Sequence, residues 1–237
     1  MISFFIPIRE NSRRIKYKST RKIGKFNLGL TEIKVNHLKK LKSLVKKNKK
    51  IPKIEFIVST DSNKVKKYIE NFSWIKIHNR SKQLASDDCL DDLIKEVPKI
   101  CTGNIILWTH VTSPCFNEFC YKDFIIQFLK NFKRHDSAFS ADLIGTYVLN
   151  SKYKWVSHNV KKKKWPRTQD LEKLFSVNSA AFIANRKTYV EHGNRLGNKP
   201  LPILSKEKTG FDIDEMEDLI FFKKNFAVFL SEVIIAS

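Results

Sequence analysis

The chain contains 237 residues, with 45 lysine and arginine residues against 24 aspartate and glutamate residues, which gives a formal net charge of +21. Hydrophobic residues make up 42% and aromatic residues 12%, which excludes a disordered chain and suits one α/β domain with at most a small appendage. The richest apolar run, 219–236, is interrupted by Lys223 and Lys224, so we expect no membrane span.

The positive charge first suggests a nucleic-acid-binding protein. Only nine of the basic residues are arginine, however, and the 36 lysines are scattered along the chain. A nucleic-acid interface predicts clustered arginine and aromatic residues and a strong dependence of binding on salt. We therefore keep nucleic acid only as an alternative partner, and we expect the charge to attract a smaller anionic substrate.

The cysteines and the N-terminus bear on the cellular compartment. The cysteines show neither a paired short spacing nor an accompanying histidine cluster, which argues against zinc and for free buried thiols. The first apolar run has no basic region before it, so no secretory signal is expected and the sequence predicts a cytoplasmic protein. The four cysteines are Cys89, Cys101, Cys115 and Cys120.

In chain order, the first predicted element is a buried strand over 2–8 that leads, after Pro7, into a cationic loop. In an open α/β sheet, ligands bind beyond the carboxyl ends of the strands, so this loop would meet a polyanion such as a nucleoside triphosphate. A solvated basic loop is the alternative that charge alone favours. The basic residues of the loop are Arg9, Arg13, Arg14, Lys16, Lys18, Arg21 and Lys22.

The next segments alternate between amphipathic helices and apolar strands, which predicts an α/β fold with a mostly parallel sheet covered on both faces. The predicted helices are 28–46, 63–70, 88–97 and 118–132, and the predicted later strands are 54–58, 74–78, 104–109 and 137–141. From 145 to 170 the aromatic residues alternate around a polar turn, which predicts a β-hairpin excursion from the sheet. The run 161–164 of four lysines would be its solvated tip.

Two polar segments near strand or helix ends allow a structural or a functional interpretation. The corner 59–62 can cap the following helix, and the family resemblance given below implies that it touches a ligand instead. Asp212 and Asp214 lie two apart, so in an extended segment both carboxylates point to one side, an arrangement that Mg²⁺ favours. Asp214 with Glu217 also fits the N-cap and capping box of a helix over 215–225.

Several of these segments, in this order, resemble signatures of the CMP-sialic acid synthetase family, the acylneuraminate cytidylyltransferases. Each is weak alone, but together they extend over most of the chain. The segments are Pro7-Ile8-Arg9 with Ser12, Arg14 and Lys18, then Val58 to Ser62, Arg80 to Ser86, His110 to Pro114, Arg167 to Leu171, Asn178 to Phe182, and Thr209 to Leu219.

The resemblance implies a three-layer, doubly wound α/β fold of the nucleotide-diphospho-sugar transferase type. It implies one cytidylyltransferase domain over 1–237, in which the excursion 145–170 forms a homodimer interface. The implied reaction is Mg²⁺-dependent transfer of CMP from CTP to the anomeric hydroxyl of an acidic nonulosonic sugar, an N-acylneuraminate or a relative, with release of pyrophosphate. A related enzyme acting on pseudaminic, legionaminic or an eight-carbon acid is the nearest alternative.

The resemblance also implies a role for each matching residue. Arg9, Lys18 and Asp212 would be catalytic, and Asp212 and Asp214 would hold Mg²⁺. The residues expected to bind the nucleotide are Arg9, Ser12, Arg13, Lys18, Arg80 and Ser86. The residues expected to orient the sugar are His110, Arg167, Gln169 and Asn178, with Arg167 able to reach the site of a partner subunit.

The sequence departs from the family pattern at four positions. Glu10 and Asn11 stand where glycines are usual, and Ser19 stands where an asparagine is usual. Without the glycines the backbone approaches phosphate less freely, and Glu10 adds a negative charge. His110 replaces a glutamine, so it either substitutes as a hydrogen-bonding group or marks a different sugar. A family member that binds nucleotide but turns over poorly is therefore a further alternative.

Overall fold

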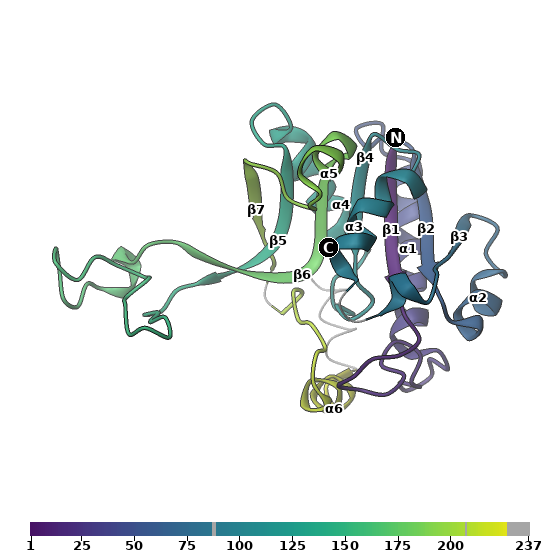
Figure 1. Cartoon of the computed structure of the whole chain (residues 1–237), viewed down its shortest axis with the longest axis horizontal. Helices are drawn as coiled ribbons and strands as arrows, with labels where there is room; N and C mark the ends of the chain where they lie inside the picture. Colours follow the sequence, from purple (N-terminus) through teal and green to yellow (C-terminus); the bar gives the residue numbers. More distant parts are fainter. Residues whose placement is uncertain (87–88, 207, 227–237) are drawn as a thin grey trace.

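The structure is a computed structural model that describes residues 1–86, 89–206 and 208–226. Its centre is a seven-stranded sheet with the strand order β3-β2-β1-β4-β6-β5-β7 (Figure 1). The strands are β1 (Ile2–Ile8), β2 (Ile54–Thr60), β3 (Ile75–Asn79), β4 (Ile105–Thr109), β5 (Ser137–Ile144), β6 (Leu174–Asn185) and β7 (Pro200–Leu204). The segment 228–236, for which the sequence leaves strand and helix open, lies outside the described residues.

The sheet is mostly parallel, as the sequence predicts. β1 pairs in parallel with β2 and β4, and β2 pairs in parallel with β3. β6 is antiparallel to both β4 and β5, while β5 is parallel to β7. The carboxyl ends of β1, β2, β3 and β4 therefore meet at one edge of the sheet, which is where an open α/β sheet binds its ligands.

Helices cover both faces of the sheet and complete three layers (Figure 1). Leucine, isoleucine and phenylalanine residues of α1 and α4 pack on one face, together with residues of α2 and α6. Residues of α3 and α5 pack on the other face. The helices are α1 (Gly29–Lys46), α2 (Asn63–Ile69), α3 (Leu90–Ile100), α4 (Glu118–Asn131), α5 (Arg186–His192) and α6 (Met216–Lys224).

The apolar strands are buried on both faces because their side chains alternate between the two layers. In β1, Phe4 and Ile6 belong to the core under α1 and α4, whereas Phe5 belongs to the core under α3. Phe5 also packs against Trp108 of β4, with ring centroids 4.9 Å apart. This contact holds β1 and β4 together near the ends from which their following loops leave the sheet.

The excursion projects far from the body of the protein (Figure 1). The sequence predicts a separate hairpin here, but the projection is carried by a long two-stranded ribbon in which Ala141 to Ile144 pair with Leu174 to Val177. Beyond this ribbon, an isolated bridge joins Leu149 to Trp155. The register shift between Phe139 and Ala141 lets the ribbon leave the plane of the sheet.

The predicted element boundaries hold closely over the first half of the chain and less well afterwards. The sequence analysis did not predict β6, α5 and β7 as elements. The predicted cap of the last helix is wrong by one residue, because the N-cap of α6 is Glu215 and its capping box is formed with Asp218. Ser62 is the N-cap of α2, but its side chain makes no capping hydrogen bond.

The expectations about a membrane span and about the cysteines can be compared with the described residues. Within the described part of the chain, no helix is both long enough and apolar enough to cross a membrane. All four cysteines are free thiols; Cys101 and Cys115 are buried, whereas Cys89 and Cys120 are only partly buried.

Candidate active site

A pocket of about 390 Å³ lies beyond the carboxyl ends of the parallel strands. It is lined by five cationic side chains and two carboxylates, together with small polar residues and one tryptophan. Arg9 and Asp212, which are 203 positions apart in the sequence, both line it. The lining residues used below are Arg9, Ser12, Arg14, Lys18, Arg80, Ser86, Trp108, His110, Ser179, Arg195, Asp212 and Asp214.

The cationic loop after β1 is bound directly to the segment before α6 (Figure 1). The buried Lys18 Nζ donates to Ile213 O at 2.8 Å and lies 3.3 Å from Asp214 Oδ1. Arg14 donates to Asp214 Oδ1 at 2.8 Å and to Glu215 Oε1 at 3.0 Å. These contacts bring the two ends of the family signature to one pocket.

The local conformation of the loop depends on the start of α1. Thr31 donates to Ser19 O through both its backbone N–H, at 3.0 Å, and its side chain, at 2.8 Å. Gly29, the first residue of α1, has φ +49°, and a Cβ there would lie 2.0 Å from Arg21 O. Only glycine combines that dihedral with such a close approach of backbone to backbone. The loop is therefore fixed on α1 by a glycine and a threonine.

Asp212 is held at the pocket by the loop after β4. Ser113 Oγ donates to Asp212 Oδ1 at 3.2 Å, and the N–H of Ile213 donates to Thr112 O at 2.8 Å. Burial raises the pKa of Asp212, and the charge of the neighbouring Asp214 raises it further. The pocket thus contains a negative charge that the protein stabilises poorly and that a divalent cation would offset.

The two carboxylates fit a Mg²⁺ ion whose remaining ligands come from water and from the substrate. Among the described residues there is no group of three or more histidine, cysteine, aspartate or glutamate residues able to hold a metal by itself. Mg²⁺ commonly takes one or two carboxylates and fills its other positions with water and phosphate oxygens. Asp212 and Asp214 supply that number, and both line the pocket.

Glu10, which replaces a usual glycine, does not line this pocket. Its side chain accepts a hydrogen bond from Ser62 Oγ at 3.2 Å, and its N–H donates to Asp61 Oδ1 at 3.0 Å. The corner after β2 therefore anchors the start of the cationic loop. Neither Asp61 nor Ser62 lines the pocket, so the corner supports the loop from behind.

Arg80 and Ser86 line the side of the pocket formed by the segment after β3. Arg80 is only 7% exposed, and its guanidinium donates to Ser59 through Nε, at 3.2 Å to Oγ, and through Nη2 to the carbonyl oxygen. Burial lowers the pKa of Arg80 to about 10, so it stays charged at neutral pH. Arg80 is therefore a positive charge in the wall of the pocket, and its hydrogen bonds to Ser59 hold it in place.

His110 is part of a stacked group on the opposite side. Trp108 Nε1 donates to His110 Nε2 at 2.9 Å, and Arg195 Nη1 lies 3.3 Å from the same nitrogen. Burial, followed by the charge of Arg195, lowers the pKa of His110 to about 3, so the ring is neutral. Since Nε2 accepts from two donors, the ring proton is on Nδ1.

Three of the four residues expected to orient the sugar are not among the pocket-lining residues of this chain. Arg167 lies on the excursion, where its exposed side chain pairs with Asp170 at 3.0 Å. Gln169 belongs to the same exposed turn. Asn178 is buried, and its amide nitrogen donates to Asp142 and Ser205, while the next residue, Ser179, lines the pocket. His110 lines the pocket as expected.

More of the residues expected to bind the nucleotide lie at the pocket. Arg9, Ser12, Lys18, Arg80 and Ser86 all line it, whereas Arg13 does not. The residues that the sequence analysis did not assign to the site are Arg14, Trp108, Ser179 and Arg195. Arg14 belongs to the first segment of the resemblance, but the nucleotide-binding role was given to its neighbour Arg13, and Arg195 follows a helix that was not predicted.

A buried lysine supports the loop that holds Asp212. Lys34 Nζ, on α1, donates to Ser113 O at 3.0 Å, to Phe116 O at 3.3 Å and to Tyr121 Oη at 2.6 Å. Burial lowers the pKa of Lys34 to about 7. The position of Ser113, and through it that of Asp212, therefore depends on this ammonium group.

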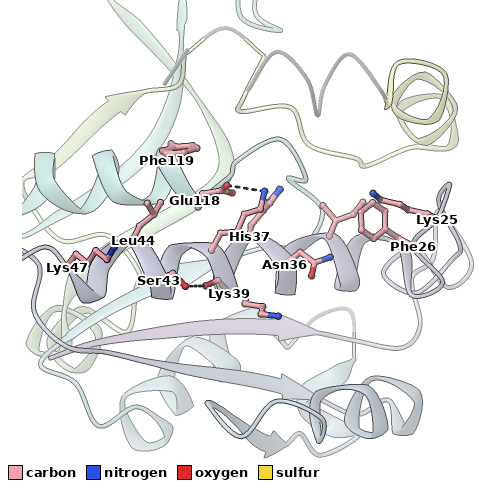
Figure 2. A pocket seen from close by; sticks show the side chains of 12 residues that line it. Lys25, Phe26, Asn36, His37, Lys39, Ser43, Leu44, Lys47, Glu118 and Phe119 are labelled. Carbon is pink, nitrogen blue, oxygen red and sulfur yellow. Dashed lines mark hydrogen bonds and ion pairs between the residues drawn. The ribbon is translucent and has the colours of Figure 1, made fainter. Parts of the chain in front are cut away.

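A larger hollow of about 1130 Å³ lies elsewhere, along α1 and α4 (Figure 2). Lysines line much of it, and Lys40 Nζ lies 3.3 Å from Glu118 Oε1. Among the described residues that line it, Glu118 is the one carboxylate, and none is shared with the pocket of Arg9 and Asp212. It therefore lacks the paired acids and the strand-end position of the candidate active site.

The three-layer fold and a cation-rich pocket at the strand ends define a nucleotidyltransferase-like α/β protein. Solved structures with a similar fold include CMP:2-keto-3-deoxy-manno-octonic acid synthetase complexed with CTP. It matches this chain with a TM-score of 0.60 and 13% sequence identity, and the match covers 95% of this chain and 98% of that chain. 4-Diphosphocytidyl-2C-methyl-D-erythritol synthase from Anaerococcus prevotii DSM 20548 has a TM-score of 0.64 and 12% identity, over 95% and 96%.

The bifunctional IspDF from Campylobacter jejuni has a TM-score of 0.61 and 12% identity, over 92% of this chain and 53% of that chain. The chain therefore spans about half the length of that enzyme. At these identities the structural likeness shows the fold alone. No curated protein matches the sequence.

The sequence itself matches a family model described as cytidylyltransferase over residues 3–214, which is most of the chain. The chain belongs to the cytidylyltransferase family. It is therefore a nucleotidyltransferase, and the expectation of cytidylyl transfer from CTP is confirmed at that level. The matched range includes the cationic loop and Asp212 and Asp214. The narrower assignment to the sialic acid branch stays a prediction.

Proposed function

We propose that the protein transfers CMP from CTP to the anomeric hydroxyl of an acidic nonulosonic sugar, an N-acylneuraminate or a relative, and releases pyrophosphate. The observation that carries this proposal is the single pocket shared by the cationic loop of Arg9 and Lys18 and by the paired acids Asp212 and Asp214. Such a pocket contains cations for a triphosphate next to carboxylates for a metal.

Arg9, Ser12 and Lys18 hold the phosphates of CTP in this proposal, and Arg14 takes the place that the sequence analysis gave to Arg13. Lys18 is almost fully buried and is held between the loop and Asp214, so its charge is fixed before the substrate binds. A preorganised cation stabilises the charge that develops on the transferring phosphoryl group without reorganisation. Arg80 and Ser86 face the base or the ribose.

Asp212 and Asp214 are the residues that would hold Mg²⁺. The ion would draw charge from the α-phosphate and lower the pKa of a coordinated hydroxyl. Arg14 and Lys18 both pair with Asp214, so they orient that carboxylate, whereas Ser113 orients Asp212. The acids are thus positioned by contacts that exist without the metal.

The reaction needs alignment more than covalent chemistry. The anomeric oxygen forms a bond to the α-phosphorus, the bond from that phosphorus to the bridging oxygen breaks, and pyrophosphate leaves with the electron pair. The hydroxyl proton passes to solvent. His110, neutral and with its proton on Nδ1, is a hydrogen-bond donor toward a sugar oxygen in this proposal.

The excursion 145–170 forms the homodimer interface in this proposal and brings Arg167 into the pocket of the partner subunit. It projects from the body and exposes large side chains, with Tyr153 88% and Trp165 65% exposed (Figure 1). Exposed apolar groups of this size are typical of an interaction surface. Arg167, exposed beside Trp165, lies on this surface.

Mixing two inactive variants tests whether Arg167 acts in the partner's pocket. Arg167→Ala and Asp212→Asn chains are denatured together and refolded, and pyrophosphate release is measured. We expect about a quarter of the wild-type sites to recover, because half of the randomly mixed dimers are heterodimers with one complete site each. No recovery above the separate variants would show that Arg167 does not act across a dimer.

The function is tested by incubating the protein with Mg²⁺, each of the four nucleoside triphosphates and a panel of acidic sugars, and following pyrophosphate release. The panel contains N-acetylneuraminic, pseudaminic, legionaminic and 2-keto-3-deoxy-octonic acids. We expect release only with CTP and one acid. The eight-carbon acid is the rival favoured by the likeness to a synthetase of that class.

Two variants test the assigned roles. The double variant Asp212→Ala, Asp214→Ala should lose pyrophosphate release, and unchanged release would reject the metal assignment. Arg9→Ala should weaken CTP binding by about 10- to 150-fold, the value of one or two charged hydrogen bonds. Unaltered CTP affinity in this variant would reject the phosphate assignment. Arg134→Ala, an exposed residue just beyond α4, is the control.

A further inference from the structure

Arg195 lines the active-site pocket from a segment that lies outside all the family signatures recognised in the sequence. It follows α5, which ends at Gly193 in the left-handed conformation with φ +56°. That dihedral turns the chain sharply after the helix. The turn directs the side chain of Arg195 back over the sheet, toward Trp108 and Phe182.

The guanidinium of Arg195 contacts three neighbours. Its Cζ lies 4.0 Å from the ring centroid of Phe182 and 5.0 Å from that of Trp108. Nη1 lies 3.3 Å from His110 Nε2, which is an acceptor because the ring is neutral. Stacking on aromatic faces leaves the nitrogens at the edge of a guanidinium as its donors.

This cation has no carboxylate partner among the described residues. Its contacts are the two rings and His110, and burial lowers its pKa. The acids of the pocket are bound elsewhere, since Asp214 pairs with Arg14 and Lys18. A partly buried charge without a counter-ion is costly unless a ligand supplies one.

Arg195 differs in this respect from Arg167, the residue that the resemblance selects for the acidic sugar. Arg167 is exposed on the excursion and already pairs with Asp170 at 3.0 Å. Arg195 is part of the pocket of the same chain that contributes Arg9 and Asp212. Within one subunit, it is therefore the cation best placed to meet an acidic acceptor beside the nucleotide.

We propose that Arg195 binds the carboxylate of the acceptor and thereby selects a sugar acid over a neutral sugar. The proposal rests on the proposed function, because it names a residue that determines the acceptor of that reaction. A guanidinium matches a planar carboxylate with two parallel hydrogen bonds. In a 2-keto sugar acid, the carboxylate is attached to the carbon that carries the reacting hydroxyl. Arg195 therefore orients the nucleophile as well as binding the acid.

The test compares an acid with its neutral ester in the wild type and in two variants. Pyrophosphate release is measured at saturating CTP and Mg²⁺ against the concentration of each acid of the panel and of its methyl ester. Arg195→Met keeps the length of the side chain and removes the charge. Arg195→Lys keeps the charge and loses the two parallel donors. Arg134→Met is the matched control, because that arginine is exposed at the end of α4.

We expect kcat/KM for the acid to fall by about 10- to 150-fold in Arg195→Met, while the KM for CTP stays within about threefold. The fall in kcat/KM for the acid should be smaller in Arg195→Lys. In the wild type, kcat/KM for the acid should exceed kcat/KM for its ester by a similar factor, and this preference should disappear in Arg195→Met. An unchanged KM for CTP also shows that the variant is folded.

Two results would overturn the inference. One is a preference for acid over ester that survives in Arg195→Met, and the other is a wild type that accepts the ester as well as the acid. A wild type that fails to bind CTP, or that binds CTP but accepts none of the acids, is a different result, because it rejects the proposed function itself.

Discussion

Replacing Lys34 by methionine tests how the protein holds the loop that carries Ser113. Lys34 is 1% exposed and donates to two carbonyl oxygens and to Tyr121 Oη. Its pKa is lowered by burial from 10.5 to about 7. The unfolded chain therefore keeps this proton up to about pH 10.5, whereas the folded protein releases it near pH 7.

Between these two pH values the unfolded state binds one proton more than the folded state, so the free energy of unfolding rises with pH. The whole lowering of the Lys34 pKa corresponds to a change of about 5 kcal/mol in the free energy of unfolding, at about 1.4 kcal/mol for each pKa unit. Over the practical range from pH 6.5 to pH 9, the same relation gives a gain in the free energy of unfolding of about 2–3 kcal/mol. Lys34→Met lacks the titrating group and loses this gain.

Urea unfolding of the wild type and Lys34→Met, followed by tryptophan fluorescence at several pH values, measures the difference. We expect the stability of the wild type relative to the variant to increase by about 2–3 kcal/mol from pH 6.5 to pH 9. The exposed Lys130→Met, on α4, should show no such pH-dependent difference. A constant difference between wild type and Lys34→Met over this range would refute the reasoning.

Three further predictions concern the cationic loop. Gly29→Ala should lower the free energy of unfolding by about 1–3 kcal/mol or more in urea unfolding, because its positive φ and the nearby carbonyl exclude a Cβ. Lys18→Met should lower kcat by about 10²–10³-fold, whereas Lys16→Met, exposed on the same loop, should leave the pyrophosphate assay unchanged. Glu10→Gly should leave kcat/KM for CTP within about threefold and lower stability by about 1 kcal/mol, since Glu10 binds Ser62 outside the pocket. A large gain in activity in Glu10→Gly would show that its carboxylate does oppose the phosphates.

The alternation of apolar strands and amphipathic helices determined the first half of the fold. β1 was predicted with its observed bounds, and α1 and α4 within one residue at each end. These elements are long and strongly patterned, so local periodicity suffices to identify them. β6 was not predicted, and its first residues, Leu174 to Val177, belong to the ribbon, where Phe175, Ser176 and Val177 are exposed and no core packing marks a strand.

The sequence also identified residues that the structure brings together, because Arg9, Lys18, His110, Asp212 and Asp214 belong to recognisable segments and all line one pocket. Although Arg14 is part of the resembling segment, the nucleotide-binding role was given to Arg13, since adjacent basic residues look alike until the direction of each side chain is known. The direction is set by contacts with residues about 200 positions away.

Arg195 shows most clearly what only the tertiary structure decided. Nothing in its local sequence distinguishes it from other surface cations. It enters the pocket because a turn at Gly193 places it over Trp108 and Phe182, which come from two neighbouring antiparallel strands. Short-range patterns specify helices, strands and motifs, whereas the partners of a charge depend on which distant segments the folded sheet brings together.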